Sequence, residues 1–322
     1  MSHSMNPLVY HIVSGHAFFF GMALLLAGSL AAFSRNRLIL RSRTLMMIIG
    51  ILLVSVSSTP LPVWFKVTAA AIVSGWIATR FCRRTSRSGV AADVPQGPVA
   101  NLPIQEPDLL NTPQQVNNRR AWPVKLFAVM CIAGIVHEAL WMSLPKLAPA
   151  KSRTLTIVGD SVTAGVGGDE TSVTWPELLA NEHRLTVQNL SHIGETAASA
   201  LDRIEDIPID SSVVLVEIGG NDVLGSTTPE EFEDDLNRLL EFLQHPNRQV
   251  VMFALPLPPF HDRWTEIQRN AATKHGTLLV PKRVFLSVIA GNESTLDTIH
   301  LSQAGHQRMA DTVWGIVRTA FD

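Results

Sequence analysis

The sequence has few cysteines and few charged residues. Cys82 and Cys131 are the two cysteines among its 322 residues, which excludes a disulfide framework and a cysteine-rich zinc module. Charged residues make up 17% of the chain, against about 25% in an ordinary soluble domain. The 26 lysines and arginines nearly balance the 28 aspartates and glutamates, so the sequence lacks the basic excess of a nucleic-acid-binding protein. We therefore expect no nucleic acid partner, and we predict that part of the chain lies in a lipid bilayer.

Long apolar runs fill the first half of the sequence. Residues 9–33 are uncharged and numerous enough to cross a bilayer as one helix, which takes about 20 residues. Pro60 and Pro62 interrupt the next apolar tract, so we interpret it as a hairpin of two short spans. Residues 1–145 are predicted to form an all-α transmembrane region with spans at 9–33, 45–58, 63–79 and 122–144. A signal peptide is the alternative for the first run, although no lysine or arginine precedes it, and a re-entrant segment is the alternative for the second.

Positive charge orients these spans. Arginine clusters follow the first and third spans and precede the fourth, at positions 35–43, 80–87 and 119–120, and such clusters stay on the cytoplasmic side. We expect a multi-pass protein of the cell membrane whose second half is periplasmic or extracellular. Residues 88–120, rich in proline and polar residues, are predicted as a disordered cytoplasmic loop, and residues 146–153 as a short tether.

From Thr154 onward, short β-branched runs alternate with amphipathic stretches. Strands are predicted at 154–158, 185–189, 213–218, 249–254 and 277–280, and helices at 174–182, 196–204, 229–245, 264–275 and 302–321. This alternation is typical of an α/β fold with a parallel sheet covered by helices on both faces. Functional groups in such folds gather beyond the carboxyl ends of the strands. Residues 154–322 are thus expected to form one α/β domain with its site at that edge.

Two small residues follow the first two predicted strands. Ser161 ends the sequence Gly-Asp-Ser directly after the first strand. A serine at a strand-to-helix turn is exposed at the sheet edge, where it can act as a nucleophile, although the alternative is an ordinary helix N-cap. Gly194 follows the second strand, where a glycine can present its backbone N–H to a ligand, and the alternative is a turn glycine. Each residue alone is weak support for catalysis.

Two further blocks strengthen the prediction. Asn221 follows a pair of glycines after the third strand and offers a side-chain amide, which can join backbone N–H groups in an oxyanion hole. Near the C-terminus, Asp297 lies three residues before His300. A nucleophilic serine needs a base, and the base needs a carboxylate that orients it. Four blocks in this order predict a serine hydrolase.

Together the four blocks resemble the SGNH (GDSL) hydrolase family, whose G-D-S, Gly, G-x-N-D and D-x-x-H motifs match around Ser161, Gly194, Asn221 and His300. Residues 175–179 and 216–222 look like the thioesterase/lysophospholipase-type esterase branch. One mild departure is Val162, where the family usually has leucine. The resemblance covers residue 154 to the C-terminus, and it implies a three-layer, flavodoxin-like parallel sheet.

The resemblance also implies a mechanism. Ser161, His300 and Asp297 would form the catalytic triad, and the backbone N–H groups of Ser161 and Gly194 with the Asn221 side chain would form the oxyanion hole. No cofactor and no metal are expected, nor an obligate protein partner. The predicted protein is a membrane-anchored carboxylic ester hydrolase, with a lipase-like site for a small-molecule, lipid or glycan acyl ester. Alternatives are an O-acetyl esterase or acetyltransferase acting on envelope polysaccharide, and an acyl-binding membrane protein without catalysis.

One pair of ionisable residues lies in the fourth predicted span. His137 and Glu138 begin like the zinc motif H-E-x-x-H, but position 141 is tryptophan. Ionisable groups in a span are functional candidates by default. Because this pair lies toward the outer end of its span, we favour placement at the membrane interface.

Overall fold

The computed structural model describes residues 5–34, 36–72, 74, 113–165, 173–291, 293–296 and 300–322, with backbone alone at 113–121. Asp297 lies outside the described residues, as do residues 88–112 of the predicted loop and the end of the third predicted span. The chain divides into two compact units. The first, here called the α/β unit, contains Met1–Gly21, Leu52–Pro60 and His137–Asp322, and the second contains Met22–Ile51 and Leu61–Val136.

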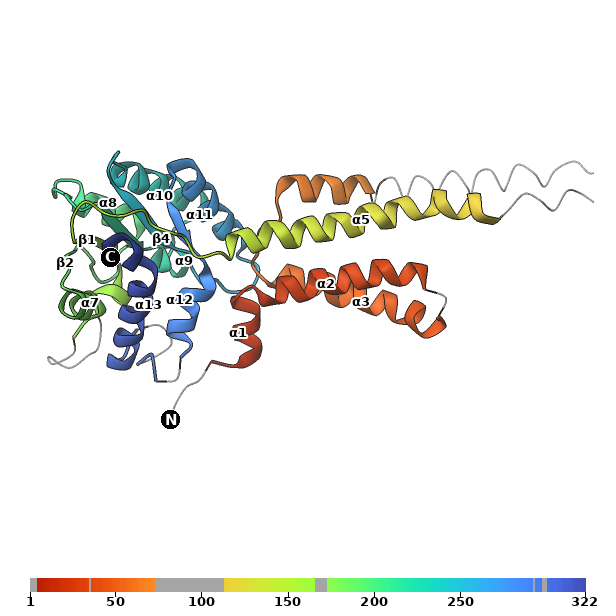
Figure 1. The fold of residues 1–322 in the computed structure, drawn as a ribbon, viewed down its shortest axis with the longest axis horizontal. Helices are drawn as coiled ribbons and strands as arrows, with labels where there is room; N and C mark the ends of the chain where they lie inside the picture. The colour runs from red at the N-terminus through yellow and green to blue at the C-terminus, as the bar shows by residue number, and fades with distance from the viewer. Residues whose placement is uncertain are drawn as a thin grey trace, which may run out of the picture. The chain divides into compact units, whose positions relative to one another are not determined.

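A five-stranded parallel sheet forms the centre of the α/β unit (Figure 1). Its strands are β1 (Thr154–Gly159), β2 (Thr186–Asn189), β3 (Val213–Glu217), β4 (Gln249–Phe253) and β5 (Leu278–Val280). Their order in the sheet is β2-β1-β3-β4-β5, the flavodoxin-like order in which the strand order reverses between β1 and β3. This confirms the predicted fold class. The predicted first and last residues of each strand lie within two residues of the observed ones.

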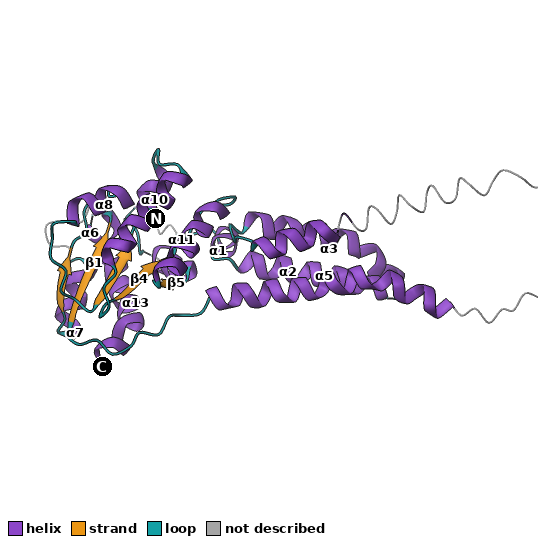
Figure 2. Ribbon diagram, turned by 90° about the horizontal axis from the view of Figure 1, so that it is seen from above, coloured by secondary structure: helices purple, strands orange, loops and turns teal. Residues whose placement is uncertain are grey.

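Helices cover both faces of this sheet, as the strands and helices of Figure 2 show. Alternate residues of each strand point to opposite faces: Ile157, Leu215 and Phe253 pack with one set of helices, and Val158, Val216 and Met252 pack with the other. The first set is α7 (Trp175–His183), α12 (Lys282–Ile289) and α13 (Gln303–Phe321), and the second is α8 (Ala197–Ile204), α10 (Pro229–Leu243) and α11 (Asp262–His275). The three layers therefore follow from buried, β-branched strands between amphipathic helices.

Local sequence sets where several of these helices begin. Thr174 and Glu177 form a capping box at α7, and Thr228 and Glu231 form another at α10, so orphan backbone N–H groups are satisfied. Two short helices, α6 (Ser161–Ala164) and α9 (Gly220–Leu224), follow β1 and β3 directly. These two helices and α12 were missing from the predicted elements, because turns of four to eight residues show too little periodicity to identify.

Apolar helices precede the α/β domain in the sequence: α1 (Pro7–Val13), α2 (His16–Leu30), the short 3-10 helix η1 (Ala31–Phe33), α3 (Arg37–Val56) and α5 (Pro113–Trp141). Three described segments are long and apolar enough to cross a membrane: His16–Phe33, Arg37–Val56 and Trp122–Trp141. The shorter Val63–Ile72 is also apolar. Thus the run expected as one span at 9–33 is divided, and α5 begins at Pro113, inside the stretch predicted as a loop.

A turn with an unusual backbone separates α1 from α2. Gly15 has φ +89°, a conformation that glycine adopts at little cost and other residues resist. Ser14 ends α1 and its N–H bonds back to the carbonyl of Tyr10. Because the division falls on a local glycine turn within an uninterrupted apolar run, hydropathy alone could not reveal it.

Glu138 is paired within the α/β unit. Its two carboxylate oxygens accept hydrogen bonds from Nη1 and Nη2 of Arg269 in α11, both at 2.8 Å. The Glu138 side chain is 2% exposed and that of Arg269 is 10% exposed. The guanidinium carbon of Arg269 also lies 5.0 Å from the Trp141 ring centroid, in reach of a cation–π contact. Glu138 is thus buried in an ion pair, and its placement at the membrane interface stays a prediction.

Candidate active site

Ser161 lies where β1 passes into α6. Asp160 is the N-cap of α6, and its side chain accepts a hydrogen bond of 3.0 Å from the N–H of Val162. Ser161 is thus the first residue of the helix and not its cap, so the alternative reading as a helix N-cap is wrong. A Cβ at Gly159 would come within 2.5 Å of Thr163 Oγ1, so only glycine allows this tight turn. The hydroxyl is held at the carboxyl end of the sheet, as predicted.

His300, near the C-terminus of the chain, lies at the same cavity as Ser161. The N–H of Leu296 donates to the carbonyl of His300 at 2.8 Å, and Thr295 and Leu301 form an antiparallel bridge. Ser302 then caps α13, accepting from the N–H of Gly305 at 3.1 Å. These contacts fix the chain around His300. Ser161 and His300 line one and the same cavity.

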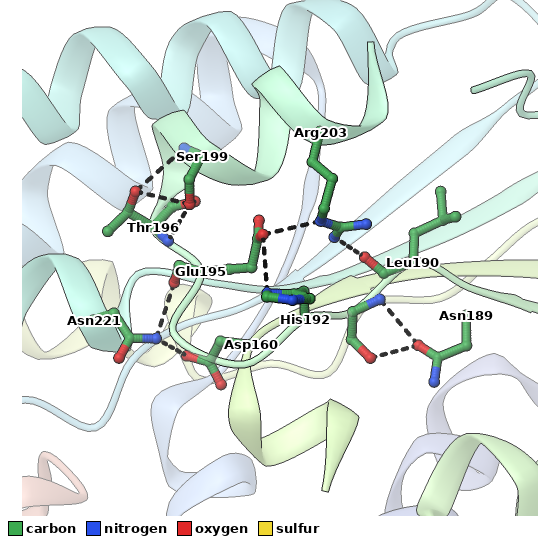
Figure 3. Close-up of polar contacts among 10 residues, drawn as sticks. Asp160, Asn189, Leu190, His192, Glu195, Thr196, Ser199, Arg203 and Asn221 are labelled. Carbon is green, nitrogen blue, oxygen red and sulfur yellow. Dashed lines mark hydrogen bonds and ion pairs between the residues drawn. The ribbon is translucent and has the colours of Figure 1, made fainter. Parts of the chain in front are cut away.

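Asn221 links the other two oxyanion candidates (Figure 3). Its side-chain nitrogen donates to the backbone oxygen of Glu195 at 2.9 Å and approaches Oδ2 of Asp160 at 3.4 Å. Glu195 directly follows Gly194, and Asp160 directly precedes Ser161. The three residues predicted for the oxyanion hole therefore lie on segments that Asn221 joins, at the ends of three neighbouring strands.

The Gly194 turn is held by its neighbours. Gly194 has φ +78°, and an added Cβ would meet nothing within 4 Å, so glycine is favoured here by backbone conformation and not by lack of space. Arg203 donates from Nε to Oε1 of Glu195 at 2.9 Å, and its terminal nitrogen also donates to the carbonyl of Leu190. Nδ1 of His192 lies 3.6 Å from the same Glu195 oxygen, as Figure 3 shows. This polar cluster braces the turn that carries Gly194.

A buried carboxyl pair lies directly beside Ser161. Glu217 at the end of β3 is 1% exposed; its side chain hydrogen-bonds to Asp160, and Oε2 accepts from Thr163 Oγ1 at 2.8 Å. Burial, with the neighbouring charge of Asp160, raises the pKa of Glu217 well above its usual range, and burial also raises the pKa of Asp160. We interpret Glu217 as the protonated partner that donates to the Asp160 carboxylate. The sequence prediction gave Glu217 no role; the available signal was a single acidic residue in the otherwise apolar strand Val-Val-Leu-Val-Glu.

Asp222, the last residue of the G-x-N-D block, and His306 make structural contacts. Asp222 is fully buried and accepts from the N–H of Ala197 at 3.0 Å, at the start of α8; burial raises its pKa to about 6. His306 is also buried, and its Nδ1 accepts from the N–H of Trp175 at 3.3 Å. Burial lowers the pKa of His306, which suits a neutral ring that accepts a hydrogen bond.

The cavity that Ser161 and His300 line has a volume of about 430 Å³, within the range of about 300–1,000 Å³ of small-molecule sites. Apart from a few polar residues, the cavity is lined mostly by aliphatic side chains, among them Val162, Leu224, Leu255, Leu257, Leu286 and Ile289. The described residues contain no group of three histidine, cysteine, aspartate or glutamate side chains placed to hold a metal ion. The site therefore combines a hydroxyl, an imidazole and an amide with an apolar chamber.

Comparisons with known proteins agree with this chemistry. A sequence profile of the GDSL-like Lipase/Acylhydrolase family matches residues 157–308. Esterase TesA of Pseudomonas aeruginosa is 30% identical over 179 residues, which cover 51% of this chain and 88% of TesA. The Thioesterase 1/protease 1/lysophospholipase L1 of Escherichia coli strain K12 is 31% identical over 128 residues, 38% of this chain and 61% of that protein.

A solved structure was also matched. The crystal structure of a TesA aligns with 26% identity and a TM-score of 0.45, covering 51% of this chain and all but 2% of that one. With most of TesA's length covered at 30% identity, and with Ser161, Asn221 and His300 lining one cavity, the family is settled. The chain belongs to the GDSL-like lipase/acylhydrolase (SGNH) family, and its α/β domain is a carboxylic ester hydrolase.

Proposed function

We propose that the protein is a membrane-anchored serine esterase that cleaves acyl esters outside the cytoplasmic membrane. The observation that carries the proposal is the shared cavity of Ser161 and His300, with Asn221 on its wall. A nucleophile, a base and an amide donor around one chamber are what acyl transfer needs.

In the proposed reaction, Ser161 Oγ attacks the ester carbonyl while His300 accepts the hydroxyl proton. The oxyanion is stabilised by the backbone N–H groups of Ser161 and Gly194 and by the Asn221 amide. Collapse breaks the ester C–O bond, and His300 returns its proton to the leaving alcohol. Water, activated by His300, then releases the acid and frees Ser161. Asp297 would orient the imidazole and stabilise its charged form.

An acyl substrate is supported by the apolar walls of the cavity, because such walls favour a hydrocarbon chain over a polar one. The names of the relatives, an esterase and a thioesterase/lysophospholipase, point to the same ester class. The membrane location is supported by three described helices that are long and apolar enough to span a bilayer. The arginine clusters support an orientation with the α/β domain outside.

Labelling with an alkyl fluorophosphonate tests the nucleophile. This probe forms a covalent bond with the hydroxyl of an activated serine. On the full-length protein in detergent, we expect one labelled peptide containing Ser161 and none in Ser161→Ala. Ser191, in the loop after β2, provides a matched control, since Ser191→Ala should label normally. Labelling at another serine, or none in folded protein, would contradict the proposed site.

A further inference from the structure

One wall of the cavity comes from the distant N-terminal segment. Met5, Val9 and Val13 line the cavity together with Ser161 and His300. Val9 and Val13 are spaced by four and so occupy one face of α1, and Met5 lies two residues before the helix begins at Pro7. Val13 is buried, whereas Val9 is 45% exposed. The α/β domain alone, residues 154–322, would therefore lack part of the chamber beside its own nucleophile.

The N-terminal helix is built into the α/β unit by specific contacts. Asn6 caps α1 by accepting from the N–H of Leu8 at 2.8 Å. At its other end, a Cβ on Gly15 would lie 3.2 Å from Cε of Lys282 in α12. Lys282 is 3% exposed, and its ammonium donates to the carbonyl of Ser57 at 3.0 Å. The end of α1 thus packs on α12, the helix that also supplies cavity residues.

The 52–60 segment is fixed to the same unit. The Ser58 hydroxyl donates to the carbonyl of Pro258, and the same oxygen accepts from the N–H of His261 at 3.2 Å. Thr265 Oγ1 donates to the carbonyl of Ser58 at 3.1 Å. Two N-terminal segments, far away in sequence, therefore pack against the domain that carries Ser161.

We infer that α1 is the specificity wall of the acyl pocket: the acyl chain of a lipid ester lies against Val9 and Val13, and these residues set the chain length that is hydrolysed. The inference rests on the proposed esterase function and assigns part of its substrate selection to the N-terminal helix. Two features favour a hydrocarbon ligand. The α1 residues that line the cavity are apolar, and Leu255 and Leu257 line the same cavity. For scale, an apolar cavity of about 150 Å³ accommodates benzene, so about 430 Å³ leaves room for a longer chain.

The order of the helices in the sequence favours a membrane lipid as the source of the acyl chain. α1 ends at Val13, and α2, the first helix with span-like length and hydropathy, begins at His16. A short turn therefore connects the pocket wall to an apolar helix of membrane type. An aliphatic wall next in sequence to such a helix favours the acyl chain of a lipid ester, whereas a polar glycan would gain nothing from it.

The chain-length profile of the full-length protein in detergent tests the inference. p-Nitrophenyl esters with two to twelve acyl carbons would be compared in wild type, Val9→Phe, Val13→Phe and Val13→Ala. Each buried methylene is worth about a fourfold gain in kcat/KM. We expect Val13→Phe to lower the kcat/KM ratio of octanoyl to butanoyl esters about sixteenfold, equivalent to room for about two methylenes. Val13→Ala should move the preference toward longer chains.

Leu8 supplies the matched control. It lies on α1 next to Val9, is 64% exposed and does not line the cavity, so Leu8→Trp adds bulk to the same helix outside the pocket. Its profile should equal that of wild type. An unchanged profile in all three pocket variants, with hydrolysis still dependent on Ser161, would overturn the inference and leave the esterase intact. Absence of Ser161-dependent hydrolysis of every ester would instead reject the esterase.

A second readout needs no turnover. A photoactivatable octanoic acid carrying a diazirine would be bound to Ser161→Ala, irradiated, and mapped by peptide mass spectrometry. We expect labelling within residues 5–13 that excess octanoic acid displaces and that Val13→Phe reduces. Displaceable labelling confined to other residues would overturn the role of α1, whatever the outcome of the kinetic assay.

Discussion

Arg269 holds both carboxylate oxygens of Glu138 at 2.8 Å, and neither side chain is appreciably exposed. The pair joins the end of α5 to α11, within the same unit as Ser161. Residues 146–153 are consequently not the sole attachment between the apolar first half and the α/β domain. The N-terminal half contributes to the folded unit that carries the site.

Removing one partner of this ion pair should destabilise the folded protein. Glu138→Gln leaves the guanidinium of Arg269 buried without its countercharge, which typically costs about 3–5 kcal/mol. We expect a clearly lower thermal transition in detergent, measured by intrinsic fluorescence. Glu233, which pairs with Arg263 at 2.7 Å on the surface, is the matched control, because losing an exposed pair costs about 0–1 kcal/mol. Equal effects of Glu138→Gln and Glu233→Gln would contradict the importance of the buried pair.

Asn221 should be needed for turnover and not for folding. In Asn221→Ala, the transition state loses one oxyanion donor, which commonly lowers kcat about 10²–10³-fold. Steady-state hydrolysis of p-nitrophenyl butanoate by the full-length protein measures this, with Asn247→Ala as an exposed control. A normal kcat in Asn221→Ala would show that the amide serves only to link Glu195 with Asp160.

Glu217 should tolerate loss of its ionisable group but not loss of its hydrogen bonds. Since burial keeps its pKa raised, glutamine reproduces the protonated form, donating to Asp160 and accepting from Thr163. Glu217→Gln should therefore keep activity within a few-fold of wild type. Glu217→Ala leaves a cavity and two unpaired buried groups and should destabilise the protein by about 2–4 kcal/mol. A large loss of activity in Glu217→Gln would mean that its negative charge is required.

Asp222 should make stability depend on pH. Its folded pKa of about 6 lies above the ordinary value of 3.8, so the folded state binds the proton more tightly than the unfolded state does. Protonated Asp222 therefore makes its full contribution to the free energy of unfolding below about pH 4. That contribution, up to about 3 kcal/mol, is lost as the pH rises through about 6. Asp222→Asn removes the titration and can still accept from the N–H of Ala197. The thermal transition temperature of Asp222→Asn relative to that of wild type should increase from pH 4.5 to pH 7.5. A difference between the two temperatures that stays constant over this range would contradict the raised pKa of Asp222.

Much of this architecture was predictable from the sequence. The five strands were predictable because buried parallel strands are short β-branched runs, and the positions of Ser161, Gly194 and Asn221 after three of them placed the site. What could not be predicted depends on contacts between distant residues. The partner of Glu138 is Arg269, 131 positions away in the sequence, and no local pattern pairs these two residues. Likewise, nothing in the composition of α1 shows that Val9 and Val13 line the same cavity as Ser161.

The most direct test of the central claim is kcat/KM for ester hydrolysis by the full-length protein in detergent, compared between wild type and Ser161→Ala. The account predicts turnover of acyl esters in wild type and loss to the uncatalysed rate in Ser161→Ala, while both proteins unfold at similar temperatures. Hydrolysis that survives in Ser161→Ala would contradict it.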